Sequence, residues 1–365
     1  MIYLDHGATS YIKPPQVEAA MIRALHRCAN PGRGGYRQSI EAARTVYRCR
    51  EQAAQLFGCE PEQVVFTANC TQGLNTAIFS MFSPGDRVVI SGFEHNAVVR
   101  PLYALGAKVI VAGRKLFDWE DTIKEFKKAL EQGADGAVFT HVSNVFGYIL
   151  PVKQLAALCQ QYRVPFVIDC AQSAGMLPID FRGLGAQCIA MPGHKGLLGP
   201  QGTGILLCKD LMKPLLHGGT GGDSQSRSMP DFLPEGMEAG TLNVPGIAGL
   251  SAGLSYLVHR GIADVESQAV MQCKLCAKNL ENLGYRVFFG DNQLATVSFV
   301  PDTDCEVFAQ RLANKGIAVR AGLHCAPLAH ESAGTLQTGT VRISYGHDAR
   351  FFQTKSFLKV LGEIG

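Results

Sequence analysis

The stretch "QCIAMPGHKGLLGPQGTGILLC" at residues 187–208 decides the fold, because it places a histidine and a lysine in a glycine-rich turn between two apolar runs. The flanking segments Gln187–Met191 and Gly202–Cys208 are continuous apolar runs, which are typical of strands buried on both faces. Glycines between them allow the backbone to approach a flat ligand closely. A lysine desolvated there, Lys195, can bond covalently to an aldehyde. The alternative is an exposed surface loop.

Further apolar runs precede this stretch and alternate with segments of helical periodicity. The predicted strands are Gln63–Thr67, Arg87–Ser91, Lys108–Gly113, Gly136–Val142 and Pro165–Asp169. The predicted helices are Gln16–Cys28, Ile40–Phe57, Thr71–Phe82 and Trp119–Gly133, the last capped by Asp118. This alternation predicts an α/β fold with a mainly parallel sheet flanked by helices.

The pattern changes after Gly246, where one long helix is predicted over Ile247–Leu283. Strands at 285–289, 294–300, 317–320 and 340–345, a helix at 304–315 and a terminal helix follow, and they predict a smaller α+β domain. We therefore expect a large cofactor-binding domain at residues 15–245 and a small domain built from 1–14 and 246–365. The polar, glycine-rich segment Gly221–Pro234 is expected to be a mobile loop.

Composition excludes several classes of protein. The 365 residues carry 34 Lys and Arg against 31 Asp and Glu, spread without basic runs, so no nucleic-acid partner is expected. Twelve irregularly spaced cysteines do not form a disulfide framework, and Cys273 and Cys276 fall in a predicted helix, so no metal site is expected there. Neither a leader peptide nor a membrane span is recognisable, so we expect no membrane partner and a cytoplasmic protein.

Polar residues follow the ends of three predicted strands. In "VFTANCTQG" a helix begins near Thr71, and its first backbone N–H groups could cradle a phosphate; the simpler interpretation is a helix cap by Asn69 or Thr71. Asp169 ends the strand of "VIDCAQSAG" and could hold a cationic ring nitrogen, with Gln172 beside it, or could cap the next segment. His95 in "EHNAVV" could stack on a ring or carry protons, or could be simply hydrogen-bonded.

A late segment, "RAGLHCAPLAH" at 320–330, places a cysteine beside a histidine in a loop. Cys325 could be a reactive thiolate. It could also be a buried free cysteine, or a metal ligand together with His324 and His330, although four ligands are not evident. No phosphate-binding loop of the G-x-x-x-x-G-K-[ST] type runs through Lys195, and the dinucleotide-binding pattern G-x-G-x-x-G is not followed.

The order of these features along the chain resembles the cysteine desulfurase branch of the class V aminotransferase family, which are pyridoxal-phosphate (PLP) enzymes of fold-type I. The resemblance extends from "YLDHGATS" to "TGTVRISYG", and "GHKGLLGPQGTG" and "RAGLHCA" are its most specific parts. It implies that Lys195 binds the cofactor covalently, that Asp169 pairs with the ring nitrogen, that Gln172 contacts the ring hydroxyl and that His95 stacks on the ring.

The resemblance also implies the remaining site residues. The phosphate would be held by Cys70 through its backbone, by Thr71 and His194, and by Thr241 of a neighbouring subunit, so a homodimer is expected. Asn144 and Arg342 would bind the substrate carboxylate, Arg320 is a further substrate-binding candidate, and Cys325 would accept the sulfur.

The implied activity converts L-cysteine to L-alanine and leaves a persulfide on Cys325, for transfer to an acceptor protein in iron–sulfur, selenium or other sulfur chemistry. The alternatives are a selenocysteine lyase, another class V enzyme such as an epimerase or aminotransferase, and a non-catalytic scaffold that docks a sulfur carrier. The sequence departs from the family pattern in three places. Pro192 stands where many relatives have Ser or Thr, Leu323 interrupts "GHHCA", and the Arg33-Gly34 pair lacks its preceding His.

Overall fold

A seven-stranded sheet forms the centre of the larger part of the molecule. The computed structural model describes residues 1–32, 34–222 and 225–364, so Arg33 of the expected Arg33-Gly34 pair lies outside it. The strand order is β2 (Val64–Thr67), β8 (Gly204–Cys208), β7 (Cys188–Pro192), β6 (Phe166–Asp169), β5 (Gly136–Thr140), β3 (Arg87–Ser91) and β4 (Lys108–Ala112). Within this sheet β8 runs antiparallel to β7 and β2, and the other pairs are parallel.

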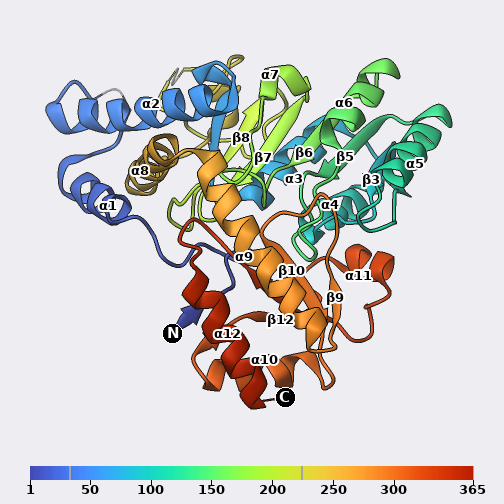
Figure 1. Cartoon of the computed structure of the whole chain (residues 1–365). Helices are drawn as coiled ribbons and strands as arrows, with labels where there is room; N and C mark the ends of the chain where they lie inside the picture. The colour runs from blue at the N-terminus through green and yellow to red at the C-terminus, as the bar shows by residue number, and fades with distance from the viewer. Residues whose placement is uncertain (33, 223–224, 365) are drawn as a thin grey trace.

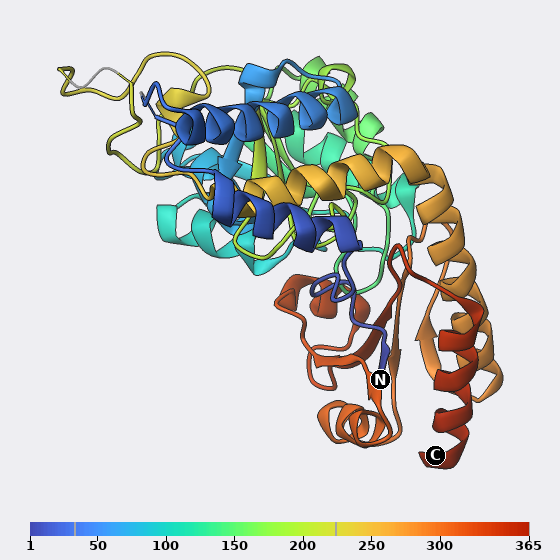
Figure 2. The same ribbon diagram turned by 90° about the vertical axis from the view of Figure 1, so that its left-hand side faces the viewer.

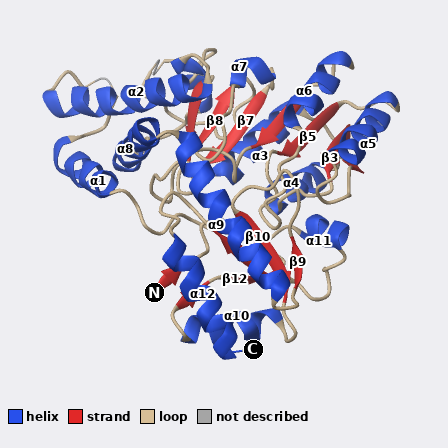
Figure 3. Ribbon diagram, viewed as in Figure 1, coloured by secondary structure: helices blue, strands red, loops and turns tan. Residues whose placement is uncertain are grey.

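Helices cover both faces of this sheet (Figures 1 and 3). They are α1 (Pro15–Arg27), α2 (Arg37–Phe57), α3 (Cys70–Met81), α4 (Asn96–Leu105), α5 (Trp119–Glu131), α6 (Val152–Gln161), α7 (Phe181–Leu184) and α8 (Val244–Arg260). Two short 3-10 helices, Pro61–Gln63 before β2 and Glu235–Met237 before α8, complete this part. The predicted α/β class is confirmed, and the predicted cap of α5 is present, because the Asp118 carboxylate accepts a hydrogen bond from the Asp121 amide at 2.9 Å.

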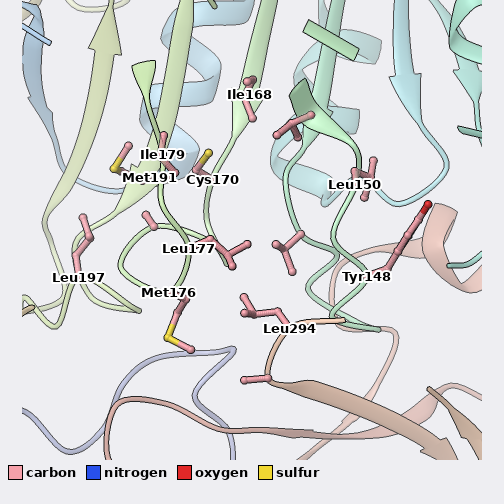
Figure 4. Close-up of a cluster of buried hydrophobic side chains, with 14 of the residues drawn as sticks. Tyr148, Leu150, Ile168, Cys170, Met176, Leu177, Ile179, Met191, Leu197 and Leu294 are labelled. Carbon is pink, nitrogen blue, oxygen red and sulfur yellow. The ribbon is translucent and has the colours of Figure 1, made fainter. Parts of the chain in front are cut away.

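A four-stranded antiparallel sheet lies below the large one, in the order β12 (Arg320–Gly322), β13 (Thr340–Ser344), β10 (Thr296–Val300) and β9 (Arg286–Phe288). The helices around it are α9 (Ile262–Asn282), α10 (Cys305–Asn314), α11 (Pro327–Ala333) and α12 (Phe351–Ile364). Figure 4 shows buried side chains where the two parts meet, with Cys170 and Leu177 below the large sheet and Leu294 on the side of β10. The substrate and cofactor candidates lie near this junction.

Two predicted elements are divided in the structure. The predicted helix Ile247–Leu283 is two helices, because the chain turns at Gly261, whose φ of 83° is a conformation that favours glycine. As a result α8 packs against α1 and α2, while α9 runs along the small sheet (Figure 1). The predicted strand 317–320 is also wrong, because β11 (Ile317–Ala318) and β12 belong to different sheets.

The N-terminal segment connects the two parts. Strand β1 (Ile2–Tyr3) pairs in parallel with β11, and Asp5 forms a bridge with Ser344 of β13. The chain then passes the turn at residues 193–196 that carries Lys195, here called the lysine turn. The Ser10 amide donates to the carbonyl of His194 in this turn at 3.1 Å, and the chain then enters α1 (Figure 2). The division into 15–245 and 1–14 with 246–365 stays a prediction, as does the mobility of Gly221–Pro234, of which residues 223 and 224 lie outside the described ranges.

No helix within 1–32, 34–222 and 225–364 has both the length and the apolar character needed to cross a membrane.

A buried ion pair ties α2 to the segment before α8. Arg50 donates to a carboxylate oxygen of Glu238 and to the carbonyl of Val64, and its guanidinium lies 4.6 Å from the ring centre of Phe66. The other oxygen of Glu238 accepts a hydrogen bond from the Phe66 amide. Both charges are almost fully buried, so each depends on the other for compensation.

We expect Glu238→Ala to lower the free energy of unfolding by about 3–5 kcal/mol, because it leaves the Arg50 charge buried without a partner. The matched control is Glu363→Ala, which removes the exposed partner of Lys315 (3.5 Å) and should cost about 0–1 kcal/mol. Urea unfolding of both variants measures the difference, and equal losses would contradict the assigned role of the pair.

Candidate active site

Lys195 lies in the turn that follows β7, where the large sheet meets the N-terminal segment. Its side chain is half-buried and lines a cavity together with His6, Gln172, Ser344 and other residues. Burial lowers the pKa of the Lys195 ammonium, and the nearby Arg342 guanidinium lowers it further. A lysine in this state is a better nucleophile near neutral pH than a solvated one.

Asp169 ends β6, the strand next to β7, and its Cα pairs in register with that of Ala190. It is 2% exposed, and burial raises the pKa of its carboxyl, whereas hydrogen bonding and the Lys195 charge act in the opposite direction. Its Oδ1 accepts from the Ala171 amide at 2.8 Å and lies 3.5 Å from the Cys70 thiol. The carboxylate is therefore held in one orientation near the Lys195 amine, and its pairing with a ring nitrogen stays a prediction.

The start of α3 lies beside this carboxylate. Asn69 caps the helix by accepting from the Gln72 amide at 2.9 Å, Cys70 is buried, and Thr71 is exposed. Gly204 at the start of β8 touches this turn so closely that a Cβ there would lie 2.7 Å from the Asn69 backbone carbon. Glycine is thus required for the sheet to approach the helix start, which leaves the first N–H groups of α3 as an anion site next to Asp169.

His95 caps α4, with Nδ1 accepting from the Ala97 amide at 3.0 Å. Burial, then the Lys195 charge, lowers the pKa of His95 to about 4, so its ring is neutral. The preceding residue, Glu94, is fully buried and fixes this loop, because its Oε1 accepts from the Thr140 amide of β5 at 2.9 Å and from Ser91 of β3.

His194 and Gln172 both bond to the N-terminal segment. The Nδ1 of His194 lies 3.0 Å from the Thr9 hydroxyl, and its carbonyl accepts from Ser10 and Lys13. Burial, followed by the Lys195 charge, lowers the pKa of His194 to about 4. Gln172 donates from Nε2 to the Gly7 carbonyl at 3.0 Å. The lysine turn is therefore positioned by residues far away in the sequence.

Arg342 on β13 and Asn144 after β5 are brought together, as predicted. The Arg342 Nη1 donates to the Asn144 carbonyl at 2.9 Å, and Nη2 forms an ion pair with Asp5 at 2.6 Å. Burial lowers the pKa of Arg342, and Asp5 counteracts this. Exposed Arg320 on β12 is the cross-strand partner of Arg342, so two guanidinium groups share one register position. Like charges placed opposite each other destabilise a sheet, and an anion between them would relieve the repulsion.

Cys325 is the exposed cysteine among the twelve, all of which the structure describes. It follows β12 in a tight turn where His324 and Cys325 have φ values of 50° and 56°, and its carbonyl accepts from the Asn96 amide at 2.8 Å. This hydrogen bond holds the cysteine beside the loop that carries His95. The alternative of a buried free cysteine is wrong.

His324 points away from solvent, unlike its neighbour Cys325. Its Nε2 lies 3.2 Å from both the carbonyl and hydroxyl of Thr340, and its ring stacks on that of His330 at 5.7 Å. Burial holds the pKa of His324 well below its usual range, so a charged His324 is not available to support a thiolate. Among the described residues, no group of three or more His, Cys, Asp or Glu side chains is placed to hold a metal ion.

Thr241 lies away from the cavity that Lys195 lines. It is exposed in a separate hollow together with Tyr47 and Arg50. Within this chain Thr241 is therefore not part of the site, and its expected role toward a neighbouring subunit stays a prediction.

Sequence reasoning missed Asp5, Gly7 and Glu94 as residues of this site. Asp5 and Gly7 lie in "YLDHGATS" and Glu94 in "EHNAVV", both of which were quoted for other reasons. A carboxylate beside a glycine or a histidine gives no local sign that it will contact Arg342 or the end of β5. These contacts join residues that are 337 and 46 positions apart.

Comparison with known proteins identifies the class to which this fold and site belong. The family model for aminotransferase class-V matches residues 2–353, so the chain belongs to that family, and the resemblance predicted from its motifs is confirmed.

More particular relatives are cysteine desulfurases. The chain is 32% identical to a probable cysteine desulfurase of Pyrococcus abyssi over 100% of this chain and 94% of that protein. It is 30% identical to one of Methanothermobacter thermautotrophicus, with 99% and 93% covered. Its structure is similar to the apo cysteine desulfurase of Thermococcus onnurineus NA1, with a TM-score of 0.91, 30% identity, and 100% and 94% of the two chains covered.

The loop before α4 provides a test that depends on pH. Burial raises the pKa of Glu94 to about 8, and no described residue bonds to its Oε2, so this carboxyl holds a proton in the folded protein. The unfolded chain releases that proton at a lower pH, so wild-type stability should fall as pH rises from about 5 to 8. Glu94→Gln should remove most of this decrease while keeping the acceptor for Thr140. Unfolding free energies of both proteins at pH 5 and pH 8 measure it, and an unchanged pH dependence would reject a protonated Glu94.

Proposed function

We propose that this protein is a PLP-dependent cysteine desulfurase that converts L-cysteine to L-alanine and carries the released sulfur as a persulfide on Cys325. The single observation that supports this best is the arrangement of a half-buried, pKa-lowered Lys195 beside strand-end Asp169, with an exposed cysteine held near His95. Relatives named cysteine desulfurase over the full length of the chain support the same activity.

The residues present fit the cofactor. The α3 N-terminus with Cys70 and Thr71 would hold its phosphate, the Asp169 carboxylate would pair with the ring nitrogen, and neutral His95 would lie on the ring. His194 and Gln172 would add contacts from the lysine turn and the β6 end. When bound through Lys195, PLP supplies an electron sink for carbanion chemistry at the substrate.

Pro192 ends β7 without a hydroxyl or a backbone N–H to offer a phosphate. The amides at the start of α3, uncovered because Gly204 has no side chain, would compensate for the missing donor.

Arg342 and Asn144 would bind the substrate carboxylate, with exposed Arg320 at the outer side. Guanidinium groups bind carboxylates in a planar geometry with two hydrogen bonds, so Arg342 would orient the amino acid as well as attract it.

Two groups of the chain would then carry the chemistry. Neutral Lys195 Nζ can accept the proton from the substrate Cα, for which its lowered pKa is suited. The Cys325 thiolate attacks the substrate sulfur, so an S–S bond forms while the Cβ–S bond breaks. The electron pair of the broken bond stays with the carbon fragment, which takes up protons to become alanine. The same groups would serve selenocysteine, so turnover of both amino acids must be compared.

The structure also motivates a homodimer. Apolar side chains on α1 and α2 are exposed in the single chain: Ile22, Leu25, Ile40 and Tyr47. Tyr47 shares its hollow with Thr241, the residue expected to reach a neighbouring cofactor. A second copy covering this face would bury the apolar surface and bring Thr241 to its phosphate. An acceptor protein would take the sulfur from exposed Cys325.

We expect Tyr47→Asp to convert the dimer to monomers in sedimentation experiments, because it places a charge in the apolar interface. Phe352→Asp on α12 is the matched control, since the two rings are 50% and 54% exposed, and it should leave the dimer intact. A monomeric wild-type protein would refute the dimer.

Two variants separate cofactor binding from sulfur transfer. Cys325→Ala should keep the cofactor absorbance but lose at least about a hundredfold in alanine formation from cysteine, because the sulfur has no acceptor. Lys195→Ala should lose the covalent attachment, so that borohydride leaves no adduct. Alanine release and sulfane sulfur on Cys325 are both measured, and wild-type alanine release by Cys325→Ala would remove the cysteine from the mechanism.

A further inference from the structure

We propose that Asp5 is a positioning residue that holds Arg342 in place and, by its charge, limits how tightly that arginine binds the carboxylate of an amino acid. The inference rests on the proposed function, because it assigns a ligand to Arg342. It concerns a residue of the N-terminal segment, far from β13 in the sequence.

The guanidinium of Arg342 is held by contacts with Asp5, the Asn144 backbone carbonyl and Gly7. Its Nη2 lies 2.6 Å from Asp5 Oδ1, and its Nη1 donates to the Asn144 carbonyl at 2.9 Å. Gly7 covers it so closely that a Cβ there would lie 3.0 Å from Cζ. Any larger residue at position 7 would displace the arginine, so the segment that carries Asp5 is shaped around this side chain.

Asp5 is itself held firmly. It forms a backbone bridge with Ser344, two residues after Arg342 on β13, and the Gly7 amide donates to the Ser344 hydroxyl at 2.7 Å. The Tyr3 hydroxyl donates to the Asp5 carbonyl at 3.0 Å and to the Thr9 carbonyl at 2.8 Å. The backbone of Asp5 is therefore fixed beside β13, and the ion pair with Arg342 Nη2 holds its carboxylate.

The Arg342 guanidinium has N–H donors left to bind a second carboxylate. Arg342 Nε is buried and has no hydrogen-bond partner among the described residues, so this donor is free for a ligand. A guanidinium has five N–H donors, of which Asp5 and the Asn144 carbonyl take two. An amino acid can thus bind while Asp5 stays in place, but its carboxylate then lies within a few ångströms of another one.

Repulsion between these two carboxylates sets the expected effect. Near a protein surface, one unit charge a few ångströms away changes the dissociation constant of a charged ligand by about tenfold or more. Screening by solvent and salt reduces this effect. Asp5→Asn keeps an oxygen that can accept from Nη2, so it removes the charge with little change in geometry. Asp5→Ala removes the acceptor as well.

Calorimetric titration of the PLP-loaded protein with L-alanine and with L-alaninamide tests the proposal, because the amide lacks the carboxylate charge. We expect Asp5→Asn to bind L-alanine about fivefold more tightly than wild type, and L-alaninamide within a factor of two. Asp5→Ala should bind L-alanine more weakly than Asp5→Asn, since its arginine is less well positioned. Unchanged or weaker alanine binding by Asp5→Asn, or equal shifts for both ligands, would overturn the proposal.

The matched control is Asp348→Asn. Asp348 is 14% exposed against 16% for Asp5, and it pairs with His6 at 3.1 Å instead of with Arg342. Its ratio of alanine to alaninamide affinity should stay within a factor of two of wild type, and a shift as large as that of Asp5→Asn would overturn the assignment to Asp5.

Cysteine turnover, measured separately, distinguishes this inference from the proposed function. A wild-type protein that binds alanine but releases none from cysteine would reject the desulfurase while the Asp5→Asn ratio still decides the inference. Turnover without the Asp5→Asn effect would reject the inference alone. A wild-type protein that binds no alanine would reject both.

Discussion

The structure depends on the burial of cationic side chains at the junction of two sheets. Lys195 and Arg342 lie where the strand ends of the large sheet face β13, and burial lowers the pKa of both. Buried charge is costly unless carboxylates and carbonyls compensate it, and here Asp169 acts on Lys195 while Asp5 pairs with Arg342. Burial thus lowers the pKa of the Lys195 amine, while the nearby carboxylates act in the opposite direction.

The N-terminal segment makes this arrangement possible. Within about ten residues it pairs with β11, contacts Arg342 through Asp5, accepts from Gln172 at Gly7 and bonds to the His194 carbonyl through Ser10. It thus connects Arg342 on the small sheet with the turn that carries Lys195 on the large one. A shift of either sheet would move both Arg342 and Lys195, because the hydrogen bonds of the N-terminal segment connect the two side chains closely.

The turn after β12 places two neighbouring side chains, His324 and Cys325, in opposite environments. His324 is turned inward to Thr340 and His330 and is neutral, so the residue beside Cys325 serves the structure of the turn. Cys325 is presented outward instead, with its carbonyl bound to Asn96. The proposed reaction requires a Cys325 thiolate, and neutral His324 supplies no positive charge to stabilise it.

Local pattern by itself determined the strands of the large sheet, the cap at Asp118 and the glycine-rich turn around Lys195, because periodicity, capping and turn chemistry act between near neighbours. It also singled out Asp169 and Cys325, whereas Asn144 and Arg342 were implied by the family resemblance; the structure places all four near the junction of the two sheets. Only the tertiary structure decided the break at Gly261, the inward turn of His324 and the pairing of Asp5 with Arg342. These depend on contacts between residues distant in the chain, and no local pattern of side chains specifies which distant groups a packed core will bring together.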